Sequence, residues 1–116
     1  MRISRKPQRG EIYWVDFSGE GHEQRGRRPA LIVQNDRGNE SSPVTNVVIL
    51  TTAPARPHFR FMVQLHAGEA NLNRDSSVNC SHIYTIDQGR LDGYVGVLST
   101  ERMKQVDEAI RFQLGL

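Results

Sequence analysis

The sequence of 116 residues contains one cysteine, Cys80, and one tryptophan, Trp14. A single cysteine excludes an intrachain disulfide and any zinc site built from paired cysteines. We therefore expect Cys80 to be a small buried thiol in a strand. No stretch approaches the roughly 18 consecutive apolar residues that a membrane-spanning helix needs. We expect neither a disulfide framework nor a membrane partner.

Motifs for metals, nucleotides and export are also missing. The four histidines do not show HExxH or HxxxH spacing, and no P-loop, GxGxxG or GxSxG segment occurs. The sequence thus predicts no metal centre and no cofactor. Residues 1–9 are basic but lead into no apolar segment, so they do not form a secretory signal, and we expect a cytoplasmic protein.

Charge gives a weak indication of the partner. Lys and Arg number 15 against 13 Asp and Glu, for a net charge of +2, and Arg greatly outnumbers Lys. Arg recognises phosphate in a planar, bidentate manner better than Lys does. The balance therefore favours a nucleic-acid partner, although a net charge of +2 alone would be unremarkable.

Hydrophobic patterning predicts a mostly β chain that forms one domain over residues 1–116. Strands are predicted at residues 11–17, 29–34, 46–52 and 59–65, with short strand segments at 77–80 and 82–86. The continuous apolar run of residues 30–33 indicates a strand that is buried on both faces. Residues 36–42 are expected to form a loop or one helical turn. Residues 66–75 should be a loop with helical character at 67–72, and the pattern of 90–98 is mixed.

The C-terminal region carries the clearest helix signal. Ser99 is a good N-cap, and Met103, Val106, Ile110 and Leu114 recur at helical spacing. With the short strands and irregular loops, this predicts a small antiparallel β-barrel or strongly bent sheet closed by a C-terminal helix.

Two places could carry chemistry. The loop before residue 29 contains His22 and Glu23 and places three arginines within residues 25–28. Pro29 restricts Arg28 to extended geometry, so this guanidinium is held at the base of a basic loop. The second place is Thr51, at the end of an apolar strand. Both have simpler readings, as a solvated charged hairpin loop and as an ordinary strand threonine.

Taken in order, these segments resemble the MazF/PemK family of toxin ribonucleases. The matching segments are residues 9–17 (RGEIYWVDF), 21–24 (GHEQ), 28–36 (RPALIVQND), 46–52 (NVVILTT), 74–76 (RDS), 84–87 (YTID) and 98–110. The resemblance covers essentially the whole chain, and the block from loop to boundary proline to buried strand is its most specific part.

The resemblance implies an SH3-like β-barrel with helices, assembled as a symmetric homodimer. It implies metal-independent cleavage of single-stranded RNA, in which the ribose 2′-OH attacks the neighbouring phosphate. The products are a 2′,3′-cyclic phosphate and a 5′-OH end. That chemistry needs stabilisation of the charge that develops on phosphorus-bound oxygens, and a path for two protons.

The family's catalytic Arg falls on Arg28 and its catalytic Thr on Thr51, with Thr52 as the adjacent ambiguity. His22 matches a histidine that some members carry, and an imidazole is a natural proton carrier near neutral pH. Members that use an Arg and an Asp before the YTID-like segment would need them near Asn79 and Ser81, where this chain has neither charge. The residues expected to contact RNA are Glu23, Gln24, Arg25, Arg27, Asn35, Thr52, Ser81 and His82.

The resemblance also implies a protein partner, a small acidic MazE-like antitoxin whose disordered tail covers the RNA groove. An Arg-rich groove would accept carboxylates as it accepts phosphates.

Two other functions remain open. Gyrase-poisoning toxins share the fold and inhibit by protein contact through a C-terminal helix that ends in an exposed Trp. The only tryptophan here is in the first predicted strand, which counts against this reading. An RNA-binding module without activity is the third possibility, and the presence of Arg28 and Thr51 argues against it.

Overall fold

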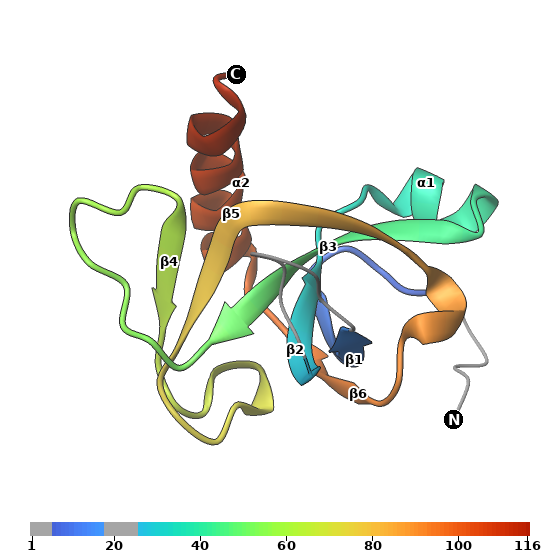
Figure 1. Cartoon of the computed structure of the whole chain (residues 1–116), viewed down its shortest axis with the longest axis horizontal. Coiled ribbons are helices and arrows are strands. Elements are labelled where there is room, and N and C mark those ends of the chain that lie inside the picture. Colours follow the sequence, from blue (N-terminus) through green and yellow to red (C-terminus); the bar gives the residue numbers. More distant parts are fainter. Residues whose placement is uncertain (1–5, 18–25) are drawn as a thin grey trace.

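The computed structural model describes residues 6–17 and 26–116. Within these residues, six strands form one antiparallel sheet in the order β4-β5-β3-β2-β1-β6 (Figure 1). The strands are β1 (Glu11–Phe17), β2 (Gly26–Ile32), β3 (Val44–Thr51), β4 (Met62–Leu65), β5 (Ser76–Asp87) and β6 (Tyr94–Val97). The helices are α1 (Asp36–Ser41) and α2 (Thr100–Leu114), and η1 (Glu69–Asn71) and η2 (Gln88–Arg90) are 3-10 turns.

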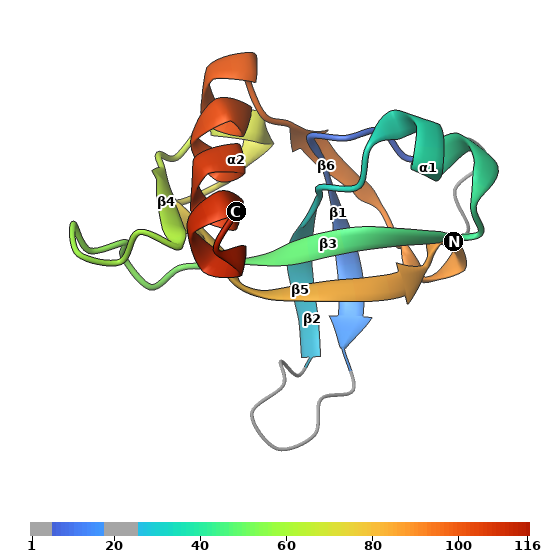
Figure 2. The same cartoon turned by 90° about the horizontal axis from the view of Figure 1, so that it is seen from above.

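The sheet is strongly bent, and β5 contributes most to the bend. β5 is one strand of twelve residues, not the two short segments predicted at 77–80 and 82–86. Its register with β3 shifts between the pairs Val47–Tyr84 and Ile49–Asn79, so extra residues of β5 are accommodated there. Such irregularities bend a strand and increase its twist. Figure 1 shows the bend of β5, and Figure 2 shows β5 running alongside β3.

Both faces of the central strands are buried, as predicted for the apolar run of residues 30–33, except that Val33 lies beyond the end of β2 and is only partly buried. Ala30 and Ile32 belong to one buried cluster with Tyr13 and Val15, whereas Leu31 belongs to the other. The period of two along a strand sends successive side chains to opposite faces. Curling the sheet encloses one cluster, and α2 covers the other by packing on β4 and β5.

Helix α2 begins where its N-cap was predicted. The Ser99 hydroxyl accepts a hydrogen bond from the Arg102 backbone N–H at 3.1 Å. Met103 and Val106 are buried as expected, together with Ala109. Leu114 is 56% exposed, so its predicted place in the buried stripe is wrong. Figure 1 shows the reason, because the last turn of α2 extends beyond the sheet.

Two other strand boundaries differ from prediction. β2 begins at Gly26, because Arg27 and Arg28 pair with Asp16 and Val15 of β1. Residues 59–61 form a turn instead of a strand, in which the Met62 N–H donates to the Phe59 carbonyl at 3.0 Å.

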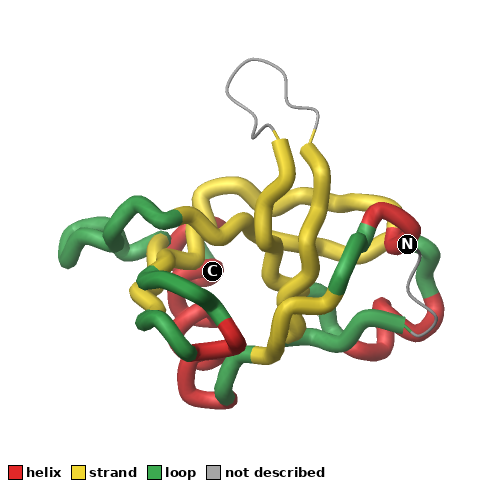
Figure 3. Tube along the Cα trace, turned by 90° about the horizontal axis from the view of Figure 1, so that it is seen from below, coloured by secondary structure: helices red, strands yellow, loops and turns green. Residues whose placement is uncertain are grey.

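The helical segments lie around the margins of the strands (Figure 3). In the described ranges, no helix is both long and apolar enough to cross a membrane. The observed fold is the strongly bent antiparallel sheet with a C-terminal helix that the sequence predicted.

Candidate active site

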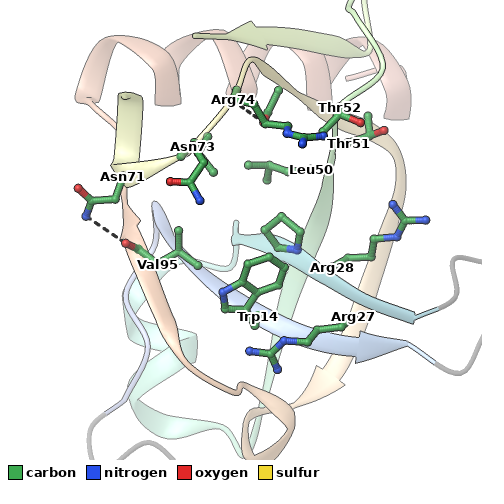
Figure 4. Close-up of a pocket in the computed structure, with 13 residues that line it drawn as sticks. Trp14, Arg27, Arg28, Leu50, Thr51, Thr52, Asn71, Asn73, Arg74 and Val95 are labelled. Atoms are coloured by element: carbon green, nitrogen blue, oxygen red, sulfur yellow. Dashed lines mark hydrogen bonds between the residues drawn. The ribbon is translucent and has the colours of Figure 1, made fainter. Parts of the chain in front are cut away.

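A cavity of about 330 Å³ opens where the ends of β2 and β3 meet β1, β6 and the segment of residues 71–74 (Figure 4). We call it the Arg28 cavity. Among its lining residues are Trp14, Arg27, Arg28, Pro29, Leu50, Thr51, Thr52, Asn71, Leu72, Asn73, Arg74 and Val95. Four sequence-predicted site residues therefore share one cavity, namely Arg27, Arg28, Thr51 and Thr52.

Arg28 is positioned by the pairing of β2 with β1. It lies opposite Val15, and the following residue, Pro29, lies opposite Trp14. The proline disfavours helical backbone at Arg28 and so keeps it extended. The side chain is exposed at the rim of the cavity. A guanidinium held on a paired strand can meet an incoming phosphate with little loss of backbone freedom.

Thr51 is the last residue of β3 and pairs with Ser77 of β5. Its hydroxyl oxygen accepts a hydrogen bond from the Ala53 backbone N–H at 3.2 Å, which leaves the hydroxyl hydrogen available to donate. Thr52 follows in the turn and is exposed. Figure 4 shows Thr51, Thr52 and Arg28 at the same edge of the cavity, opposite Asn71 and Asn73.

Arg27 has a different environment from Arg28. Its guanidinium lies 5.0 Å from the centre of the Trp14 ring and donates to the Asp92 carboxylate at 2.7 Å. This hydrogen bond lowers the pKa of Asp92. Because Arg27 is engaged by both groups, its contribution to the cavity is to support Trp14.

The segment before β5 forms the far wall of the cavity, and three contacts hold it. The Arg102 guanidinium donates to both Glu69 carboxylate oxygens, at 2.8 and 3.0 Å. These hydrogen bonds lower the pKa of Glu69 and raise that of Arg102. The Asn71 amide donates to the Val95 carbonyl at 3.1 Å. The wall is therefore tied to both α2 and β6.

Three predicted RNA-contacting residues lie away from this cavity. Asn35 caps α1, where its side chain accepts from the Gly38 N–H at 2.8 Å. Ser81 and His82 are on β5, where the Ser81 hydroxyl and His82 Nδ1 are 3.1 Å apart and the His82 ring stacks on Tyr84. The structure does not bring these three residues to Arg28 and Thr51.

Four further predictions, on His22, Glu23, Gln24 and Arg25, fall outside the described residues. Across residues 6–17 and 26–116, no group of three or more His, Cys, Asp or Glu side chains is arranged to hold a metal ion.

Sequence reasoning assigned no role to several residues of the cavity. In the sequence, Trp14 is a strand aromatic whose position counts against the gyrase-poison alternative, and Arg74 lies within a segment that matches the family. Asn73 and Val95 gave no signal, because nothing in their local sequence distinguishes them from ordinary loop and strand residues. They enter the cavity through the packing of η1 on β6.

Comparison with known proteins identifies the family to which this fold belongs. Residues 8–114 match the model of the PemK-like, MazF-like toxin of type II toxin–antitoxin systems. A protein of Staphylococcus saprophyticus named endoribonuclease MazF is 37% identical over 109 residues, which are 93% of this chain and 91% of that protein.

Solved structures give the same result. An endoribonuclease from a mycobacterial species superposes with a TM-score of 0.80 at 25% identity, covering 97% of this chain and 94% of that one. A mycobacterial endoribonuclease in complex with its cognate antitoxin has a TM-score of 0.77 at 27% identity, covering 95% and 96%. The fold is thus that of a toxin family. The chain belongs to the PemK-like, MazF-like toxins of type II toxin–antitoxin systems, as the sequence resemblance predicted.

Proposed function

We propose that this toxin is an endoribonuclease that cleaves single-stranded RNA at the Arg28 cavity without a metal ion. The observation that carries the proposal is the placement of Arg28 and Thr51 at one edge of the same cavity, from neighbouring strands. A cation and a hydroxyl donor side by side can hold one phosphate group, which is the reacting group in RNA cleavage.

In the proposed reaction the ribose 2′-oxygen attacks the adjacent phosphorus. The new bond joins O2′ to phosphorus, and the bond from phosphorus to the 5′-oxygen of the next nucleotide breaks. Negative charge develops on the nonbridging oxygens, where Arg28 supplies positive charge and Thr51 donates a hydrogen bond. The products are a 2′,3′-cyclic phosphate and a 5′-OH.

Two protons move in this reaction, one from the 2′-OH and one to the 5′-oxygen. A guanidinium is a poor base, but the N–H groups of Arg28 can donate toward the leaving oxygen. His22 is the proposed proton carrier, since an imidazole accepts and releases protons near neutral pH.

The direct test is to incubate the purified toxin with a long single-stranded RNA in EDTA and to map the ends. We expect discrete cuts that leave 5′-OH and 2′,3′-cyclic phosphate ends. Arg28→Ala should lower the cleavage rate by about 10²- to 10³-fold, the usual loss for one donor to the transition state. The matched control is Arg37→Ala, an exposed arginine on α1 that does not line the cavity.

A pair of threonine variants resolves the remaining ambiguity at the end of β3. If Thr51, the last residue of β3, holds the phosphate, Thr51→Val should lose activity and Thr52→Val should keep most of it. Equal turnover by Arg28→Ala and wild type would refute the assignment. No cutting by folded, antitoxin-free protein would favour a toxin that acts by binding, and gyrase inhibition would then be assayed.

We also propose that an acidic antitoxin binds across this cavity, that the toxin is a homodimer and that it acts in the cytoplasm. Related toxins have been solved with their antitoxins, including a MazE–MazF complex from Deinococcus radiodurans. The arginines at the cavity would attract carboxylates as they attract phosphates. Competition between RNA and an acidic antitoxin peptide tests the first proposal, and sedimentation analysis tests the second.

A further inference from the structure

The Arg28 cavity has a part that phosphate chemistry does not use. Trp14 and Val95 give this part an apolar lining, away from the edge that carries Arg28 and Thr51 (Figure 4). Pro29, Leu50 and Leu72 add apolar surface to the cavity. We propose that this part binds the base of a nucleotide beside the scissile phosphate, and that Asn73 selects the base. The inference rests on the proposed function, which it extends to substrate recognition.

The Trp14 ring is a preformed stacking surface. It is half-buried on β1, and the Arg27 guanidinium covers one side of it, 5.0 Å from the ring centre. Asp92 fixes Arg27 through the 2.7 Å hydrogen bond. Figure 4 shows Arg27 on the side of the ring away from Asn73. Bases of every kind stack on aromatic rings, so Trp14 provides affinity with little selectivity.

Asn73 can supply the selectivity. Its side chain lines the cavity on the wall opposite Thr51, between Asn71 and Arg74 (Figure 4). Within the described residues, its amide has no hydrogen-bond partner. A carboxamide places a donor beside an acceptor and so pairs with one edge of a base through two hydrogen bonds, as Asn does with adenine in DNA complexes.

The wall that carries Asn73 is held in place before any ligand binds. A Cβ atom added to Gly96 would lie 2.2 Å from the Ala70 carbonyl oxygen, so η1 packs directly on the backbone of β6. The Glu69–Arg102 ion pair and the Asn71–Val95 hydrogen bond secure the same turn. A site that is already ordered loses little affinity to ordering on binding.

The distribution of charge in the cavity matches that of a nucleotide. Arg28 lies at one edge, and the Arg74 guanidinium is directed toward Thr51 and Thr52 (Figure 4). The apolar part with Trp14 and Asn73 lies on the other side. A volume of about 330 Å³ is at the small end of the range for ligand sites, as expected for one nucleotide.

The test measures base preference and not only rate. A random-sequence single-stranded RNA is cleaved by wild type, Asn73→Ala and Asn73→Asp, and the bases around each cut are counted. Loss of a bidentate pair should change the preference at one position beside the cut by about 5- to 150-fold. Asn46→Ala is the matched control, since Asn46 is on β3 away from this cavity.

Unchanged base preference in both Asn73 variants overturns the proposal, whether or not their rates fall. A second measurement is independent of cleavage. Because Trp14 is the only tryptophan, its fluorescence reports stacking directly. Short DNA oligomers, which lack the attacking 2′-OH, should quench it, and Asn73→Asp should alter which oligomer binds best.

The two measurements separate the two proposals. Base-dependent quenching by a protein that never cuts RNA would leave the subsite standing and refute the endoribonuclease mechanism. Cutting that is lost in Arg28→Ala, with unchanged base preference in the Asn73 variants, would refute the subsite alone.

Discussion

Replacing Gly96 by alanine should destabilise the fold and distort the Arg28 cavity together. The new Cβ atom would meet three backbone atoms of Ala70, its carbonyl oxygen at 2.2 Å, its carbonyl carbon at 2.6 Å and its Cα at 3.0 Å. Ordinary contact begins at 3.4 Å, so the oxygen is too close by 3.4 − 2.2 = 1.2 Å. No side-chain rotation relieves this contact, and therefore η1 must move away from β6.

The size of the effect follows from this displacement. Overpacking of a well-filled site costs about 1–3 kcal/mol of unfolding free energy. At about 2.1 cal/mol/K per residue, the unfolding entropy of this chain is about 0.24 kcal/mol/K, or about 4 °C per kcal/mol. The melting temperature should therefore fall by about 4–12 °C in thermal unfolding followed by circular dichroism. Misplacement of the wall by about 1 Å should also reduce RNA cleavage, by up to about 100-fold.

The matched control is Gly89→Ala. A Cβ atom there would meet only the Asp87 side-chain oxygen, at 3.1 Å, so a shift of a few tenths of an ångström accommodates it. We expect its melting temperature to stay close to that of wild type. A Gly96→Ala protein with the stability and cleavage rate of wild type would refute the close packing of η1 on β6 and the role assigned to the wall.

Two other predictions concern ionisable groups. The folded-state pKa of Glu69 lies below its ordinary 4.5, because Arg102 donates to the carboxylate. The ion pair therefore stabilises the fold above pH 4.5, and this contribution is lost as the pH falls from 4.5 through the folded-state pKa. In urea unfolding, Glu69→Gln should therefore lose less free energy of unfolding than wild type as the pH is lowered. Identical pH dependence of the two proteins would contradict the ion pair. Burial raises the pKa of the Cys80 thiol to about 12, so a thiol reagent at pH 8 should modify it only as the chain unfolds. Rapid modification of the native protein would contradict its burial.

The sequence predicted most elements where hydrophobic pattern and local hydrogen bonding decide the outcome. The strand at residues 11–17 and the cap at Ser99 are local features, and both are confirmed. Of the run predicted to be buried at residues 30–33, residues 30–32 are buried, whereas Val33 lies beyond the end of β2 and is only partly buried. Cys80 is buried in a strand as expected. Predictions were less accurate where a strand depends on its partner. Residues 77–86 belong to one strand because β3 pairs with β5 on both sides of the register shift, whereas β4 pairs only with residues 76–79.

The candidate site likewise has one part that local sequence predicts and another that depends on tertiary packing. The sequence by itself singled out Arg28 and Thr51 as candidates, because a boundary proline and a strand end restrict the local backbone and because both positions match catalytic residues of the family that the chain resembles. Only the tertiary structure decided that both share a cavity with Trp14 and Asn73. Asn73 reaches it because Gly96 admits η1 against the backbone of β6, a contact between residues far apart in the chain. Local sequence sets backbone preferences, whereas the residues that a side chain contacts depend on how elements distant in the chain pack together.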